Sequence, residues 1–146
     1  MVCRIQLIVV KRDKIMDKIR ILLVDDNITF LNMDASFLSD RDNLVVVGTA
    51  QNGDEALSQT ANLRPDVVLL DVNMPGLNGI ETTPHLRQIL PGAGILMLSF
   101  QNSETYKEAA LVAGADDFIP KDTLAFALIP AIERVSQRRE RFVSVQ

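Results

Sequence analysis

The stretch VVLLDVNMPGLNG, residues 67–79, decides the fold and directs attention to one carboxylate. A run of aliphatic residues ends at Asp71, and a polar loop that is rich in turn-forming residues follows. A short apolar run without alternation is typical of a strand covered on both faces, as in a parallel sheet. We therefore expect this strand to carry Asp71 to the edge of a hydrophobic layer.

Similar apolar runs recur along the chain, and segments with helical spacing separate them. The other predicted strands are 19–25, 44–50, 94–99 and 116–120. The predicted helices are 28–40, 53–63, 79–90, 103–113 and 123–141. Regular alternation of strand and helix predicts an α/β domain with a doubly wound, five-stranded parallel sheet.

Local signals support several of these helices. In 28–40, the spacing places Phe30, Met33 and Phe37 on one face, with Leu31 and Leu38 beside it. The segment 79–90 follows Asn78 and has Glu81 in the position of a capping box, while 103–113 begins at Ser103 and ends before Gly114. Met33, Met74 and Met97 are expected to be packing residues.

The composition limits the class of protein. The chain has 146 residues, 47% apolar and 23% charged, and a net charge of −4, which predicts one globular domain without a nucleic-acid-binding surface. No apolar run is long enough to span a membrane. The single cysteine, Cys3, cannot form an internal disulfide, which favours a reducing, cytoplasmic location. We expect an N-terminal extension over 1–15, the domain over 16–135, and a helical tail or linker start over 136–146.

Polar side chains follow the predicted strands where each strand ends. They are Asp25 and Asp26, Asp71, Ser99 and Lys121. In open parallel sheets, sites form beyond the carboxyl ends of the strands, so these side chains should converge. Oxygen ligands suit Mg²⁺, and a carboxylate that is ionised at neutral pH can attack phosphorus without a separate base. Lys121 and Ser99 offer donors to phosphoryl oxygens.

This constellation resembles the receiver (CheY-like) domain of two-component response regulators. The strings that carry the resemblance are ILLVDD, DVVLLDVNMPGLNG, LMLSF and AGADDFIPKD, in this order over residues 18–135. The resemblance implies a flavodoxin-like (βα)5 fold, a three-layer sandwich. It also implies a phosphoacceptor domain rather than an enzyme that turns over an external substrate.

The resemblance assigns roles at the acidic end of the site. Asp71 would accept a phosphoryl group from a histidine kinase or a phosphotransfer protein. Asp26 would ligate Mg²⁺ directly, Asp25 mainly through a water molecule, and Asn73 through its backbone carbonyl. Pro75 and Gly76 would shape the intervening loop as a type II turn.

The resemblance also implies a switch. Ser99 would swing toward the phosphoryl group, Lys121 would bond to a phosphoryl oxygen, and Phe118 would fill the space that Ser99 leaves. The surface that changes is the family's helix four, strand five and helix five, which here are the predicted elements 103–113, 116–120 and 123–141. Partners, including a second copy in a homodimer, would dock on that surface.

Two features depart from the family pattern. Phe100 stands after Ser99, where the family has a smaller residue, and its ring is expected to narrow access to Asp71. The chain has no output domain after its tail, so it is either an isolated receiver or part of a longer regulator, for example one with a helix-turn-helix output domain. Two other functions stay open: a degenerate receiver that acts only as an interaction module, and a Mg²⁺-dependent phosphatase of the haloacid dehalogenase type. Asn73 argues against the phosphatase, because that class has an acid two residues after its nucleophile.

Overall fold

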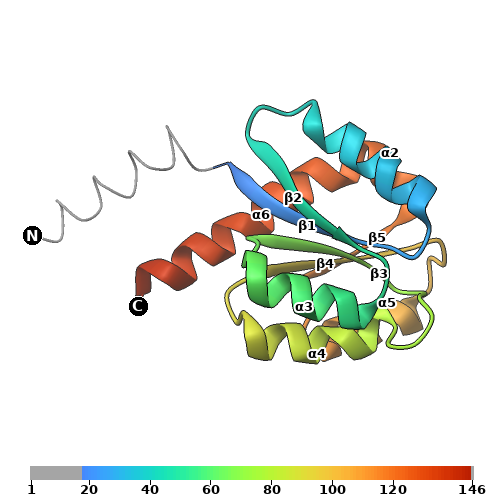
Figure 1. Cartoon of the computed structure of the whole chain (residues 1–146). Coiled ribbons are helices and arrows are strands. Elements are labelled where there is room, and N and C mark those ends of the chain that lie inside the picture. Colours follow the sequence, from blue (N-terminus) through green and yellow to red (C-terminus); the bar gives the residue numbers. More distant parts are fainter. Residues whose placement is uncertain (1–17, 146) are drawn as a thin grey trace, which may run out of the picture.

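The computed structural model describes residues 18–145, with side chains described through residue 137, and it confirms the predicted fold class. The five strands form one parallel sheet in the order β2-β1-β3-β4-β5 (Figure 1). Their bounds are β1 Ile19–Val24, β2 Leu44–Ala50, β3 Val67–Asp71, β4 Gly94–Ser99 and β5 Asp117–Pro120. The predicted extension 1–15 lies outside the described residues.

Helices cover both faces of the sheet and complete a three-layer, flavodoxin-like sandwich (Figure 1). Their bounds are α2 Ile28–Ser39, α3 Gly53–Leu63, α4 Gly79–Ile89, α5 Glu104–Ala113 and α6 Leu124–Val145, with a 3-10 turn at Lys121–Thr123 before α6. The helices α2 and α6 share one hydrophobic cluster with the sheet, and α3, α4 and α5 share the other.

Each inner strand contributes to both clusters. Along β3, Val67 and Leu69 pack toward α2 and α6, while Val68 and Leu70 pack toward the opposite helices. All residues of β3 and β4 are buried, as the unbroken apolar runs predicted. This two-sided packing holds the carboxyl ends of β3 and β4 in fixed positions.

The predicted helix signals are present. The side chain of Asn78 accepts a hydrogen bond from Glu81 N at 2.8 Å, and the Glu81 carboxylate accepts one from Asn78 N at 3.3 Å. The hydroxyl of Ser103 caps α5 at its start, and Gly114 ends it in the left-handed region with φ +117. These caps fix where the loops between strand and helix begin and end.

One expectation about α2 is wrong. Met33 is 59% exposed, so it is not a packing residue, whereas Leu31 and Leu38 are buried. The helix turns the face that carries these two leucines toward the sheet, and Ala35 packs beside them. Met74 and Met97 are buried as expected.

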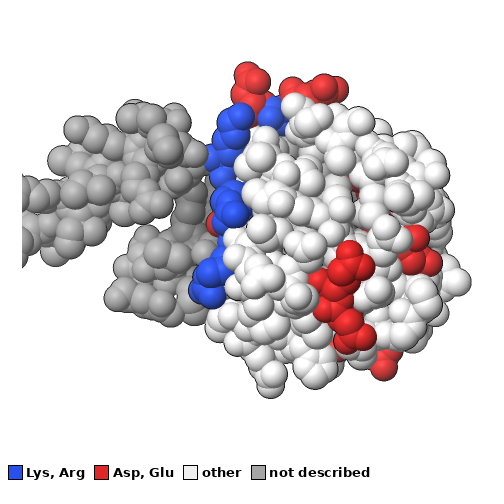
Figure 2. Space-filling model, in the orientation of Figure 1, with Lys and Arg blue, Asp and Glu red and all other residues white. Residues whose placement is uncertain are grey.

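Charged side chains are distributed unevenly over the domain. In Figure 2, lysine and arginine side chains run along the left edge, while acidic side chains gather on the right and at the top. The right side is where Figure 1 has the carboxyl ends of the strands. Among the described residues, no helix is both long and apolar enough to cross a membrane.

Candidate functional site

The side chains at the carboxyl ends of the strands converge. Asp25 follows β1, Asp71 is the last residue of β3, Ser99 is the last residue of β4, and Lys121 follows β5. Each of these side chains belongs to a buried residue, with exposed fractions between 0% and 8%. Burying four polar groups at one end of the strands destabilises the fold unless these groups form hydrogen bonds or ion pairs.

Lys121 joins two of the carboxylates. Its Nζ lies 2.8 Å from Asp25 Oδ2 and 3.0 Å from Asp71 Oδ1. The ammonium side chain is 3% exposed, and the two carboxylate side chains are 5% and 7% exposed. Burial alone lowers the pKa of Lys121, but the hydrogen bond from its ammonium to Asp25 and the charge of Asp71 outweigh it, so the pKa lies above its ordinary value.

Asp25, Asp26 and Asp71 form a cluster of oxygen ligands. One carboxylate oxygen from each lies within 4.8 Å of the others, and Asp26 is exposed while its two neighbours are buried. Burial raises the pKa of Asp71 to about 6, with Lys121 opposing the rise and Asp25 and Asp26 adding to it. An all-oxygen set that is partly open to water suits a hard cation such as Mg²⁺, which retains some of its water ligands.

The loop after β3 is tied to the neighbouring strand. The amide of Val72 donates to Leu98 O at 3.0 Å, and the amide of Gly79 donates to Val72 O at 2.9 Å. Gly76 has φ +75, as a type II turn requires at its second central position. Asn73 lies exposed in this loop. These hydrogen bonds therefore hold both ends of the loop that contains Asn73 close to the end of β3.

Ser99 and Phe118, to which the resemblance assigns the switch, are both buried. The hydroxyl of Ser99 accepts a hydrogen bond from Gln101 N at 3.0 Å. The ring of Phe118 is 6% exposed and packs in the cluster that includes Met97 and Ala110. The ring is thus already inside the domain in this structure, whereas the switch implied by the resemblance would move it inward only after phosphorylation.

Two aromatic rings also contact the site. Lys121 Nζ lies 4.7 Å from the ring centroid of Phe30 and 4.8 Å from that of Phe100. The two rings meet edge to face, 5.1 Å apart. The sequence singled out Phe100 for its bulk, but it assigned Phe30 only to a helix face, because nothing local shows that α2 passes beside Lys121.

Asp34 and Gly79 were not identified from the sequence. Asp34 is partly buried on α2, one turn after Phe30, and burial raises its pKa to about 6 while Lys121 opposes and Asp25 adds to the rise. A Cβ on Gly79 would lie 2.4 Å from Asp71 O, so only glycine fits there against the backbone of the acceptor strand. In the sequence, the pair Asn78-Gly79 at the start of α4 is the signal that points to a special position for Gly79.

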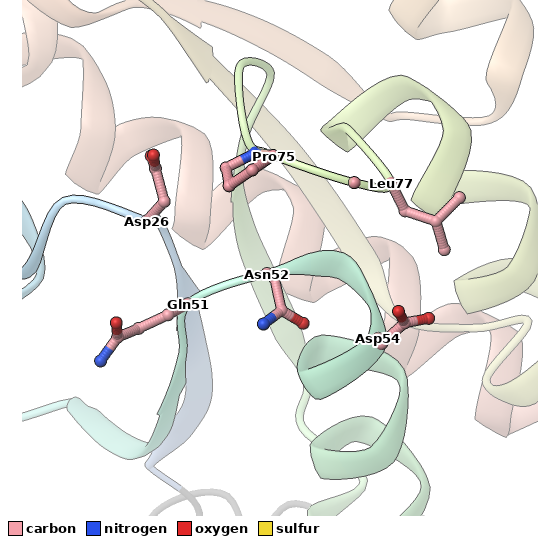
Figure 3. A pocket seen from close by; sticks show the side chains of 7 residues that line it. Asp26, Gln51, Asn52, Asp54, Pro75 and Leu77 are labelled. Atoms are coloured by element: carbon pink, nitrogen blue, oxygen red, sulfur yellow. The ribbon is translucent and has the colours of Figure 1, made fainter.

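A shallow pocket adjoins the acidic cluster on the side of Asp26. It has a volume of about 660 Å³ and is lined by the loops that follow β1, β2 and β3 (Figure 3). Asp26 and Asp54 lie on its wall together with Pro75 and Leu77. The exposed carboxylate of the cluster therefore faces open space that solvent or a partner can enter.

Fold and site together define the class: a flavodoxin-like α/β domain with a cation-compatible carboxylate cluster and a buried lysine at the carboxyl ends of its strands. The family comparison is specific. The model of the response regulator receiver domain matches residues 21–133, and the chain belongs to that family, which acts in two-component signalling.

Relatives and solved structures agree with this assignment. The chain is 36% identical over 115 residues to a protein-glutamate methylesterase/protein-glutamine glutaminase of Clostridium acetobutylicum, covering 77% of this chain and 33% of the relative. It is 35% identical over 121 residues to the transcriptional regulatory protein DegU of Brevibacillus brevis, covering 83% and 51%. The chain therefore spans a third to about half of the length of these relatives.

Among solved structures, the response regulator domain of Thermotoga maritima CheB matches with a TM-score of 0.77 at 30% identity, covering 82% of this chain and 97% of that one. A two-component response regulator of the LuxR family from Aurantimonas matches with a TM-score of 0.79 at 30% identity, covering 83% and 86%. The resemblance inferred from the sequence motifs is confirmed at the level of family and fold.

Proposed function

We propose that this chain accepts a phosphoryl group on Asp71 from a histidine kinase or a phosphotransfer protein in the cytoplasm, and that phosphorylation changes the surface of α5, β5 and α6. The observation that carries the proposal is the cluster of Asp25, Asp26 and Asp71, two of which also pair with one buried lysine. A structural ion pair needs one acid for one base. Three carboxylates at the switch edge of the sheet are better explained by a cation and a phosphoryl group.

Asp71 is the proposed nucleophile. Its pKa of about 6 leaves it ionised at neutral pH, and the end of β3 holds it in place. Its carboxylate oxygen would form a bond to phosphorus while the bond from phosphorus to the donor's imidazole nitrogen breaks, and the imidazole leaves as the neutral ring after taking up a proton. The product is an acyl phosphate with a new negative charge at the site.

The residues present fit Mg²⁺. Asp26 and Asp71 would hold it through carboxylate oxygens, Asp25 mainly through a water molecule, and Asn73 through its backbone carbonyl. When bound, the ion neutralises charge on the phosphoryl oxygens. Asp25 and Asp71 stay close together in the described structure because Lys121 lies between them.

Lys121 and Ser99 are the proposed receivers of the new charge. The ammonium would turn from the Asp71 carboxylate to a phosphoryl oxygen, and the Ser99 hydroxyl would leave Gln101 N for another. Phe118 lies on β5, which pairs with the strand that carries Ser99, so it would adjust to that movement. Because Phe118 is already buried, we propose that phosphorylation stabilises its inward position rather than creating it.

The surface coupled to this switch carries exposed apolar side chains. Leu111 and Val112 on α5 are 43% and 88% exposed, and Phe126 on α6 is 74% exposed. Such side chains suit a partner or a second copy of the chain. We propose that this surface, rather than the acidic edge, transmits the signal.

Labelling with acetyl phosphate tests the proposal. We expect Mg²⁺-dependent incorporation of one phosphoryl group into the chain, detected by intact mass, and none in Asp71→Asn. Asp42→Asn is the matched control, because Asp42 is an exposed acid just before β2, at the amino end of the strands and away from the site. Absence of label in the native chain would favour the degenerate receiver, and continuous hydrolysis of an added phosphate ester would favour the phosphatase.

A further inference from the structure

The ammonium of Lys121 is surrounded by more than its two carboxylates. Both phenyl rings place their centroids within 5 Å of Nζ, at 4.7 Å for Phe30 and 4.8 Å for Phe100. An ammonium within about 6 Å of a ring centroid is attracted by the ring quadrupole, and more strongly where water is excluded. The Lys121 side chain is 3% exposed, so water is excluded here.

The position of Phe100 is not explained by burial. Its ring is 63% exposed, so it gains little from removal of apolar area from water. Its described contacts are with Phe30 and with the ammonium. Attraction to the cation and the edge-to-face contact with Phe30 are therefore interactions that can hold it in place.

We propose that Phe30 and Phe100 form an aromatic clamp that positions the Lys121 ammonium for phosphoryl transfer. The clamp consists of these two residues, and it rests on the function proposed above. The physical reason is that the partner of the ammonium changes during the reaction and the rings do not. When Asp71 becomes an acyl phosphate, the negative charge moves from its carboxylate to the phosphoryl oxygens, so the ammonium must turn toward a new partner. The rings keep the ammonium at the site while it turns.

A clamp and a simple steric lid predict opposite effects of ring removal on the rate of labelling. A lid slows the approach of a phosphoryl donor, so removing ring bulk would speed labelling. A clamp preorganises a cation for developing phosphoryl charge, so removing the aromatic face would slow labelling. Leucine separates the two roles, because it retains most of the apolar bulk and has no π face. Tyrosine retains the face and adds only a hydroxyl.

The first test is the rate of Mg²⁺-dependent labelling of the full chain by acetyl phosphate. We expect Phe30→Leu and Phe100→Leu each to slow it by about three- to tenfold, which is roughly 0.7 to 1.4 kcal/mol of transition-state stabilisation. Phe100→Tyr should restore the rate to nearly that of the native chain. Phe37→Leu is the matched control, because Phe37 lies near the other end of α2 and packs against the hydrophobic cluster instead of the ammonium.

The second test needs no phosphorylation. The side-chain ammonium of Lys121, observed by nitrogen-15 NMR, should show ring-current shifts and slow proton exchange in the native chain. Both should be reduced in the two leucine variants and retained in Phe100→Tyr. Unchanged ammonium signals in both leucine variants, or labelling that is equal or faster in them, would overturn the clamp. If the native chain takes no label, the proposed function fails, and the NMR signals alone decide the clamp.

Discussion

Removal of the Lys121 ammonium is the most informative perturbation of the site. In Lys121→Met the side-chain volume is nearly kept, but Asp25 and Asp71 lose their shared counter-charge while their side chains stay 5% and 7% exposed. Breaking a buried ion pair from one side typically costs about 3–5 kcal/mol. We expect the lower end, roughly 3 kcal/mol, because the neighbouring Asp26 opens the cluster to water and cations.

Urea unfolding followed by circular dichroism measures this loss, first without divalent cations at neutral pH. Mg²⁺ should then recover more stability in the variant than in the native chain, because the ion no longer competes with Lys121 for the same carboxylates. At a concentration about 100 times its dissociation constant, a bound ligand contributes about 2.7 kcal/mol. Lys107→Met is the matched control, since Lys107 is exposed on α5 and its loss should change stability by no more than about 0.5 kcal/mol.

The direction of the pH effect provides a further check. Lys121 opposes the rise in the pKa of Asp71, so without Lys121 that pKa rises further in the folded state, and the folded state binds more protons than the unfolded chain at mildly acidic pH. Lowering the pH should therefore restore stability to Lys121→Met relative to the native chain. A variant as stable as the native chain, or one that Mg²⁺ does not rescue, would refute the account of a lysine held between carboxylates that can bind a cation.

Three other substitutions test separate parts of the account. The pKa of Asp34 is raised from 3.8 to about 6 in the folded chain, so between these pH values the folded state binds a proton that the unfolded chain does not, and stability falls as the pH rises through them. Asp34→Asn should flatten this dependence on pH. In urea unfolding at neutral pH the variant should gain roughly 1–2 kcal/mol, a value that allows for the screening of a half-buried group by solvent. Gly79→Ala should lose about 1–3 kcal/mol, measured by thermal unfolding, because the new Cβ would meet Asp71 O at 2.4 Å; a neutral effect would contradict the tight fit against the acceptor strand. Phe118→Ala should lose about 3–5 kcal/mol in urea, since the ring is 6% exposed, and a much smaller loss would indicate that the ring spends time outside the core.

Much of the fold follows from local patterns in the sequence. The unbroken apolar runs of β3 and β4 predict strands covered on both faces, and Asn78, Ser103 and Gly114 mark helix ends because caps act within a few residues. The convergence of polar residues also follows, since parallel strands align their carboxyl ends. These inferences require only the order of elements along the chain.

Contacts between remote segments were not predictable in the same way. Whether Met33 or Leu31 faces the sheet depends on the rotation of α2, which packing decides. The approach of Phe30 to Lys121 depends on how the start of α2 is placed against the residue that follows β5, and the raised pKa of Asp34 depends on the same placement. Such features arise from tertiary packing and carry no short-range sequence signal.

The most direct measurement is the chemical identification of the phosphorylated residue. After treatment with acetyl phosphate and Mg²⁺, borohydride reduction converts an aspartyl phosphate into homoserine, and peptide mass spectrometry locates the change. The account predicts homoserine at position 71 and at no other position, with none formed when Mg²⁺ is withheld. Homoserine at another aspartate, or none at all under these conditions, would contradict it.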